Sequence, residues 1–269
     1  METKGKNLTI KVIVLVSYIL MIVVNTLANM MPLNGINTGE ISNNYANLFA
    51  PTGFTFAIWG LIYLLLAAYV LYQLGLFDGN KSEANKKLVS RVGILFSVSS
   101  FANAAWIFCW HYDYIPLSVL LMLVILLCLI FINEAIKKEE LAVRDKIFIR
   151  LPFSVYFGWI TVATVANVTV LLVSLGWNGF GLAPEVWTVI ILVVAALIGG
   201  VTSIVNRDVA YGAVILWAYV GILFKHISAS GYSGEYPAVI TTTIACLVML
   251  AMCVVYILFS HKHVRGQRK

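Results

Sequence analysis

The chain has 269 residues, of which 61% are hydrophobic and 11% are charged, and its formal net charge is +6. Soluble domains contain roughly 45–50% apolar and about 25% charged residues, so this chain has too few polar side chains to cover a water-facing surface. The composition excludes a disordered chain, a nucleic-acid-binding domain and a disulfide-stapled secreted scaffold, and it predicts an integral membrane protein.

The N-terminal apolar run follows three lysines, as it does in a signal peptide. Lys4, Lys6 and Lys11 come before residues 12–31. This run has the roughly 20 residues that cross a bilayer, whereas the apolar part of a signal peptide has about 7–15. We therefore expect a retained first transmembrane helix.

Seven further apolar runs follow, each long enough to cross a bilayer. A single segment satisfies its backbone amides in hydrocarbon only as a helix, and no alternation of polarity indicates a barrel. The seventh run is the shortest: residues 209–224 extend about 24 Å, so it spans only if residues 225–229 continue the helix. The eight predicted spans are residues 12–31, 53–76, 89–109, 115–133, 151–175, 186–205, 209–229 and 237–260.

The positions of the cations predict the orientation of these spans. With the N-terminus in the cytoplasm, seventeen of the eighteen Lys and Arg lie on the cytoplasmic side, and only Lys225 lies outside. Cytoplasmic loops of membrane proteins carry such an excess of cations. We therefore expect eight spans with both termini in the cytoplasm. Arg207 and Asp208, in the tight turn between spans six and seven, are expected to be an exposed, weakly coupled pair.

The first outer loop, residues 32–51, is unusually long and is rich in Asn, Gly and Ser, with Glu40 as its only charge. Loops of this length in compact domains are usually functional or disordered. The sequence leaves two interpretations open, a floppy external loop or a lid over a binding site.

Groups for ordinary catalysis are scarce. The middle of every predicted span lacks Asp, Glu, Lys and Arg, which an ion-coupled transporter or proton pump would place there. The cysteines and histidines occur without the spacing of a metal site. His111, Asp113 and Glu134 are the titratable residues in their part of the chain that an intramembrane enzyme could use.

Aromatic and amide side chains stand in the spans instead. An amide in hydrocarbon, such as Asn25, Asn103 or Asn167, needs a partner, which is either another helix or a ligand. Trp59, Trp106 and Trp159 lie inside spans two, three and five, whereas Trp110, Trp177 and Trp187 lie near span ends, where tryptophan usually marks the membrane interface.

One face of the predicted fifth span combines four of these residue types. Tyr156, Trp159, Ala163 and Asn167 follow one another at intervals of three, four and four residues, so they share a helix face. A phenol, an indole, a small residue and an amide offer a flat aromatic ligand surfaces to stack on, a gap and a hydrogen-bond partner. An ordinary helix interface can have the same composition.

Three motifs occur in order on predicted spans two, three and five. Residues 51–63 read PTGFTFAIWGLIY, residues 103–106 read NAAW, and residues 156–167 read Y-x-x-W-x-x-x-A-x-x-x-N. These motifs resemble P-P-G-W-V-F…W-x-x-L-Y, N-x-A-W and Y-x-x-W-x-x-x-A-x-x-x-N of the TspO/translocator family of tryptophan-rich sensory proteins. The resemblance covers residues 10–175, and Phe54 stands where the family has Trp.

The resemblance implies a TspO-like five-helix transmembrane bundle over residues 1–175, followed by three additional transmembrane helices and a basic tail over residues 176–269. It also implies a pocket between helices one, two and five for a flat hydrophobic ligand, typically a porphyrin or haem-like molecule, with the first outer loop covering it. No cofactor is required; the expected partners are membrane lipids, the ligand and a second copy in a homodimer, and not nucleic acid. The candidate ligand-binding residues are Phe54, Trp59, Asn103, Trp106, Tyr156, Trp159, Ala163 and Asn167.

The leading interpretation is a porphyrin-binding protein of a bacterial cell membrane, with a sensing, regulatory or transport role and no conventional catalysis. Phe54 and Trp159 would stack on the macrocycle, and Asn103 and Asn167 would hydrogen-bond its polar edge. The alternatives are a small-molecule permease, which would need broken helices or paired charges in the membrane, and, ranked below it, an intramembrane enzyme.

Overall fold

The computed structural model describes residues 2–31, 33–36, 38–45, 47–76 and 83–266, and this part of the chain is helical and contains no strand. Eight of its helices are long and apolar enough to cross a membrane, so the protein is an all-α, multi-pass membrane protein. These helices confirm the eight predicted spans. They are α1 (Glu2–Met30), α3 (Ile58–Leu74), α4 (Glu83–His111), α5 (Ile115–Lys137), α7 (Leu151–Ser174), α8 (Pro184–Asn206), α9 (Val209–Ile227) and α10 (Pro237–Gly266).

Short elements connect the spans. The first outer loop contains η1 (Leu33–Gly35) and α2 (Thr38–Asn44), and a 3-10 turn, η2 (Gly53–Ala57), leads into α3. On the other side of the fold, α6 (Val143–Asp145) and η3 (Lys146–Arg150, a π-helical turn) lead into α7. A last 3-10 turn, η4 (Gly179–Gly181), stands between α7 and α8.

Local sequence signals set several helix ends. Proline occupies the first turn of α5 and the first position of α8, where its missing N–H leaves no hydrogen bond unmade. Arg207 ends α8 in the left-handed conformation, with φ at 47°, and the Asp208 carboxylate then accepts a hydrogen bond from the Tyr211 amide and caps α9. Asp208 is buried in this role, so the expectation that it belongs to an exposed pair was wrong.

The seventh span ends slightly earlier than predicted. Helix α9 stops at Ile227 instead of continuing through residue 229, and Ser228 is extended. The chain then folds back over the end of α9, where the amides of Tyr232 and Gly234 donate to the carbonyls of Lys225 and His226. This turn satisfies carbonyls that the end of a helix otherwise leaves unpaired.

The chain divides into two compact units, and the division falls within α7. Unit 1 comprises Met1–Ile41 and Ile58–Ile160, and unit 2 comprises Ser42–Ala57 and Thr161–Lys269. The first outer loop is therefore shared, because its first part belongs to unit 1 and its second part to unit 2. The predicted division after residue 175, into a five-helix bundle and an addition, stays a prediction.

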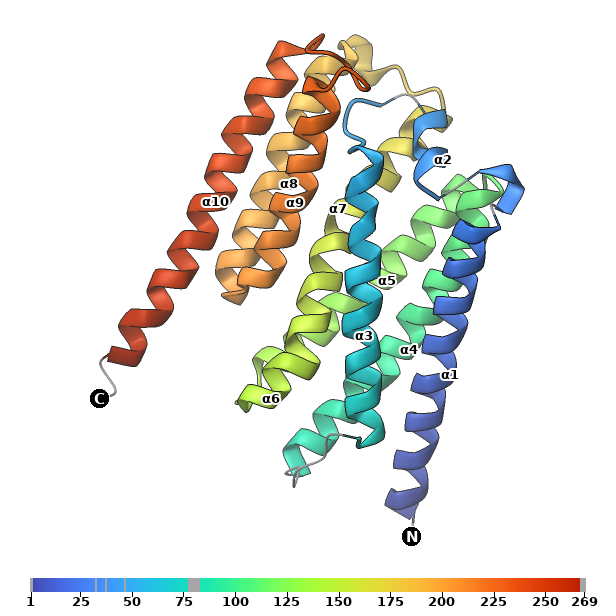
Figure 1. The fold of residues 1–269 in the computed structure, drawn as a ribbon, viewed down its shortest axis with the longest axis vertical. Coiled ribbons are helices and arrows are strands. Elements are labelled where there is room, and N and C mark those ends of the chain that lie inside the picture. Colours follow the sequence, from blue (N-terminus) through green and yellow to red (C-terminus); the bar gives the residue numbers. More distant parts are fainter. Residues whose placement is uncertain (1, 32, 37, 46, 77–82, 267–269) are drawn as a thin grey trace. The chain divides into compact units, whose positions relative to one another are not determined.

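Unit 1 is built on α4, which packs against α1 and α5, and α3 lies against α1 (Figure 1). Its consecutive spans run in alternate directions. Tyr69, Phe96 and Phe153 form a buried edge-to-face aromatic core from α3, α4 and α7, with centroids 4.8 to 5.8 Å apart. Gly93 lets the Gln73 side chain approach α4, because a Cβ there would lie 2.4 Å from the amide nitrogen.

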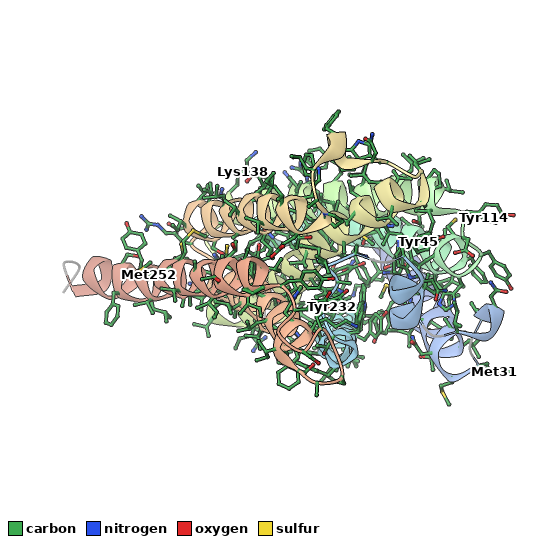
Figure 2. The ribbon with its side chains drawn as sticks, turned by 90° about the horizontal axis from the view of Figure 1, so that it is seen from above. Met31, Tyr45, Tyr114, Lys138, Tyr232 and Met252 are labelled. Atoms are coloured by element: carbon green, nitrogen blue, oxygen red, sulfur yellow. The ribbon has the colours of Figure 1, made fainter. Side chains whose placement is uncertain are left out.

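Unit 2 is built on α10, which packs against both α8 and α9 (Figure 1). Small residues permit this packing: a Cβ on Gly212 of α9 would lie 2.8 Å from the Ser203 hydroxyl of α8 and from Val254 of α10. The opposite surface of α10 is apolar and exposed, and Met252 is 61% exposed on it (Figure 2). Exposed apolar residues are expected on a span that faces lipid.

The two ends of unit 1 differ in charge. At one end, where α1 begins and α3 ends, Lys11 donates to the Leu74 carbonyl over 3.0 Å. The other end carries Met31 and Tyr114, which are 68% and 65% exposed and point away from the ribbon (Figure 2). Seven cations lie at the Lys11 end, because they occur at the start of α4, at the end of α5, and in α6 and η3 before α7: Lys87, Arg91, Lys137, Lys138, Arg144, Lys146 and Arg150. This distribution matches the predicted cytoplasmic side, although Lys81 lies outside the described residues.

Candidate functional site

Four aromatic rings from α3 and α7 meet in unit 1, and we call them the aromatic cluster: Trp59, Tyr63, Tyr156 and Trp159. The Trp59 ring stacks on Tyr63 with centroids 5.4 Å apart, and it meets Tyr156 and Trp159 edge to face at 6.0 and 6.2 Å. Tyr156 and Trp159 are buried, whereas Trp59 is partly exposed. The cluster therefore brings together three predicted site residues and adds Tyr63.

An amide network lies beside the aromatic cluster. The Asn25 amide of α1 donates to the Asn103 side-chain oxygen of α4 over 2.7 Å, and the Asn103 amide lies 3.4 Å from the Tyr156 hydroxyl, to which it donates. All three side chains are buried. Asn25 of α1 and Asn103 of α4 are thus hydrogen-bonded to each other. The partner that each of these buried amides was expected to need is therefore another helix of the protein.

The remaining two residues of the predicted α7 face lie further along the same helix. Ala163 and Asn167 continue the face of Trp159 by one and two turns, and Asn167 is buried. Both residues fall in unit 2, beyond the point in α7 where unit 1 ends. The structure therefore places the two ends of the predicted stripe in different units of one continuous helix.

Trp106 belongs to a second aromatic pair, at the end of α4. Its ring stacks on Trp110 with centroids 5.5 Å apart, and both indoles are buried. Trp110, which was expected to mark the membrane interface, donates its indole N–H to the Thr38 carbonyl of the first outer loop over 3.0 Å. This pair supports the loop.

Phe54 has partners that the sequence did not indicate. Its ring meets Trp217 and Phe224 edge to face, both at 5.5 Å, and these two residues lie two turns apart on α9. The Trp217 indole donates to the Thr55 carbonyl over 3.0 Å, and the Thr52 amide donates to the Gly221 carbonyl over 3.2 Å. Phe54 thus fixes η2 on α9 within unit 2, and 43% of its surface stays exposed.

A histidine holds the first part of the outer loop on unit 1. The Nδ1 of His111 lies 3.0 Å from the Leu33 carbonyl, which can only accept, so Nδ1 carries the proton. The Nε2 atom then accepts from the Thr38 hydroxyl over 3.0 Å, and the Asn34 side chain donates to the His111 carbonyl. We call this arrangement the His111 clasp.

A second histidine holds the later part of the loop on unit 2. The Nε2 of His226 donates to the Leu48 carbonyl over 2.8 Å, and the Tyr232 hydroxyl donates to the Asn47 carbonyl over 3.3 Å. Burial raises the pKa of the Tyr232 phenol, and Tyr236 and Glu235 raise it further, so this donor keeps its proton near neutral pH. We call this arrangement the His226 clasp.

Other polar groups lie away from the aromatic cluster. Asp145 is buried at the cationic end of unit 1, where the Tyr72 hydroxyl donates to its carboxylate and Tyr72 stacks on Phe148. Within the described residues no three His, Cys, Asp or Glu side chains are grouped as metal ligands. Helices α3 and α7 contain no charged residue, so the cluster offers π-surfaces and neutral hydrogen-bonding groups.

In the comparison with known proteins, the family model described as TSPO-like protein matches residues 11–256, which cover α8, α9 and most of α10. No curated protein and no solved structure matches the chain.

Proposed function

The chain belongs to the TSPO-like protein family, and from that premise we propose that it binds a flat hydrophobic ligand of the porphyrin class in the membrane, in a sensing, regulatory or transport role. The observation that carries this proposal is the aromatic cluster. Trp59 and Trp159 lie inside spans, where a polar indole is less favoured than at the interface, and each is packed with other rings.

The geometry of the aromatic cluster suits a flat ligand. Edge-to-face rings present faces and edges in different directions, so a macrocycle can stack on one ring and meet the edge of another. Trp59 and Tyr63 are the partly exposed members and are therefore the first surfaces that the ligand reaches. The hydrogen bond from the buried Asn103 fixes the ring of Tyr156, which packs against Trp59. Rings that are already fixed lose less conformational entropy when a ligand binds.

The absence of charge on α3 and α7 restricts what the ligand carries into the membrane. A charged group without a partner is costly in hydrocarbon. A porphyrin would therefore keep its carboxylates at the membrane interface and place its apolar ring against the aromatic cluster. Of the two sites that the sequence proposed for stacking, this proposal uses Trp159 and leaves Phe54 in contact with α9.

A titration of the purified protein with protoporphyrin IX, followed by the ligand's absorption, tests the proposal. We expect a Trp59→Ala, Trp159→Ala double variant to bind about tenfold more weakly or worse, because losing about 1.4 kcal/mol of contact energy changes affinity tenfold. Trp177→Ala is the matched control, since Trp177 contacts Phe180 and Trp187 and none of the cluster. Equal affinity of the double variant and the wild type would remove the proposed site.

A further inference from the structure

The turn between α7 and α8 carries three aromatic rings at the junction of two spans. Phe180 lies 5.5 Å from Trp177 and 6.2 Å from Trp187, and the two indoles lie 4.8 Å apart, all as ring centroids. Phe180 is nonetheless 80% exposed, the largest exposed fraction among the large hydrophobic side chains described. Exposed hydrophobic neighbours extend the surface, with Leu175 at 68% and Leu182 at 46%.

The backbone of this turn is built to hold Phe180 outward. Phe180 adopts φ 53°, a left-handed conformation that is unfavourable for a side chain with a β-carbon. The Asn178 side chain accepts a hydrogen bond from the Phe180 amide over 3.1 Å and so fixes this conformation. The hydrogen bonds of the turn maintain this strained conformation, so the exposed position of Phe180 is fixed by the structure of the turn.

Trp187 supports the turn from α8. Its indole N–H donates to the Gly179 carbonyl, and a Cβ on Gly179 would lie 2.7 Å from the indole ring. Gly179 also has φ 62°, so a glycine is required here for two reasons. The indole thus fills the space beneath the turn, and Phe180 is left outside.

The position and charge of the turn identify its partner. Both flanking helices are membrane spans, ending at Ser174 and starting at Pro184, so the turn lies where hydrocarbon meets water. No Asp, Glu, Lys or Arg occurs in residues 151–184. Uncharged segments rich in Trp, Phe and Leu favour the boundary between lipid headgroups and acyl chains.

We propose that the α7–α8 turn is a membrane-surface anchor, in which Phe180 inserts into the boundary between headgroups and acyl chains of the adjacent leaflet. The contact is apolar, so it takes zwitterionic lipid as well as anionic lipid. This anchor is independent of the proposed porphyrin site, because it uses none of the residues of the aromatic cluster.

Spin-label accessibility in lipid nanodiscs tests the anchor. The full-length protein, with its four cysteines replaced by alanine, carries one label introduced by Phe180→Cys, Leu182→Cys or Ser230→Cys. Ser230 is the matched control, since it is exposed in the polar turn between α9 and α10. We expect the ratio of collisions with oxygen to collisions with a water-soluble nickel complex to be several-fold higher at positions 180 and 182 than at 230, equally in phosphatidylcholine and in phosphatidylcholine–phosphatidylglycerol.

Two results would overturn the anchor. Nickel accessibility at 180 and 182 equal to that at 230 would place the turn in water. Protection from both reagents, with spin–spin broadening that disappears on dilution by unlabelled protein, would assign Phe180 to contact with a second copy of the chain. If the Phe180→Cys substitution relaxes the strained turn, the label at position 182 still reports where the turn lies. Leu182 has an extended backbone, so its replacement releases no strain.

Discussion

Asn103 is the residue that joins three spans of unit 1. Its side-chain oxygen accepts from Asn25 of α1, and its amide donates to Tyr156 of α7, next to the rings of the aromatic cluster. In a membrane, interhelical hydrogen bonds of this kind contribute about 0.6 kcal/mol on average and up to about 1.7 kcal/mol. The network therefore stabilises unit 1 moderately, and its larger effect is to fix the position of Tyr156.

Replacing Asn103 by alanine tests this role. We expect Asn103→Ala to lower the free energy of unfolding by about 1–2 kcal/mol, because it removes two hydrogen bonds and leaves the buried Asn25 amide with only its bond to the Met21 carbonyl. Unfolding in mixed micelles measures the change. Ser97→Ala is the matched control on α4, since the buried Ser97 hydroxyl bonds only to the Gly93 carbonyl of its own helix. A smaller loss for Asn103→Ala than for Ser97→Ala would contradict the network.

Gly221 permits the close contact between η2 and α9. A Cβ at this position would lie 2.0 Å from the Thr55 hydroxyl oxygen and 2.9 Å from its Cβ, so the segment that carries Phe54 would have to move. We expect Gly221→Ala to destabilise the protein by about 1–3 kcal/mol, the usual cost of overpacking. Gly60→Ala is the control, because a Cβ on Gly60 meets nothing within 4 Å. Thermal unfolding compares the two, and equal melting temperatures would refute the contact.

At the scale of elements, the first outer loop is fastened at two places. The His111 clasp holds Leu33, Asn34 and Thr38 on unit 1, and the His226 clasp holds residues 47 and 48 on unit 2. Leu48, Phe49 and Ala50 are buried in addition. The described part of this loop is therefore held by side-chain contacts, and its role as a lid over a binding site stays a prediction.

Each clasp is expected to govern its own half of the loop. Loss of a hydrogen bond costs about 0.5–1.5 kcal/mol, which corresponds to a several-fold faster amide exchange of the segment that it holds. We expect His111→Ala to speed exchange in residues 33–41 and leave residues 47–57 unchanged, and His226→Ala to do the reverse. Hydrogen exchange followed by mass spectrometry measures both, with Ser174→Ala as a control whose hydroxyl bonds only within α7. Equal acceleration of both halves by either variant would show that the loop opens as one piece.

Sequence patterns predicted the helices of the fold correctly, but they did not predict which residues contact each other. Hydropathy placed all eight spans, because hydrocarbon imposes the same requirement on every segment. The period of α7 correctly placed Tyr156 and Trp159 on one face, since helix geometry fixes it. Phe54 could not be placed, because its contacts with Trp217 and Phe224 join residues 163 and 170 positions apart, and no local pattern encodes such a pairing.

At the scale of the whole molecule, α8, α9 and α10 form one compact unit with the second part of the first outer loop and the second part of α7. The family model extends across them, and the second part of the first outer loop packs on α9 within unit 2. Within this unit, α9 supports the segment that carries Phe54. The orientation of the molecule in the membrane stays a prediction from its cations.

Cysteine labelling in intact cells measures that orientation. We expect a membrane-impermeant maleimide to label a Ser230→Cys variant and not a Lys138→Cys variant, because the cation-rich end of the spans should face the cytoplasm. Both positions are exposed, so the comparison depends on sidedness and not on burial. The opposite pattern would invert the topology.

The most direct test of the central claim is fluorine NMR of protein labelled with 5-fluorotryptophan, with resonances assigned by single Trp→Phe variants. A porphyrin ring current shifts nearby nuclei strongly and distant ones little. On saturation with protoporphyrin IX we expect the resonances of Trp59 and Trp159 to shift most, and those of Trp177 and Trp187, at the α7–α8 turn, to stay in place. Shifts confined to tryptophans outside the aromatic cluster, or none at saturation, would contradict the proposed ligand site.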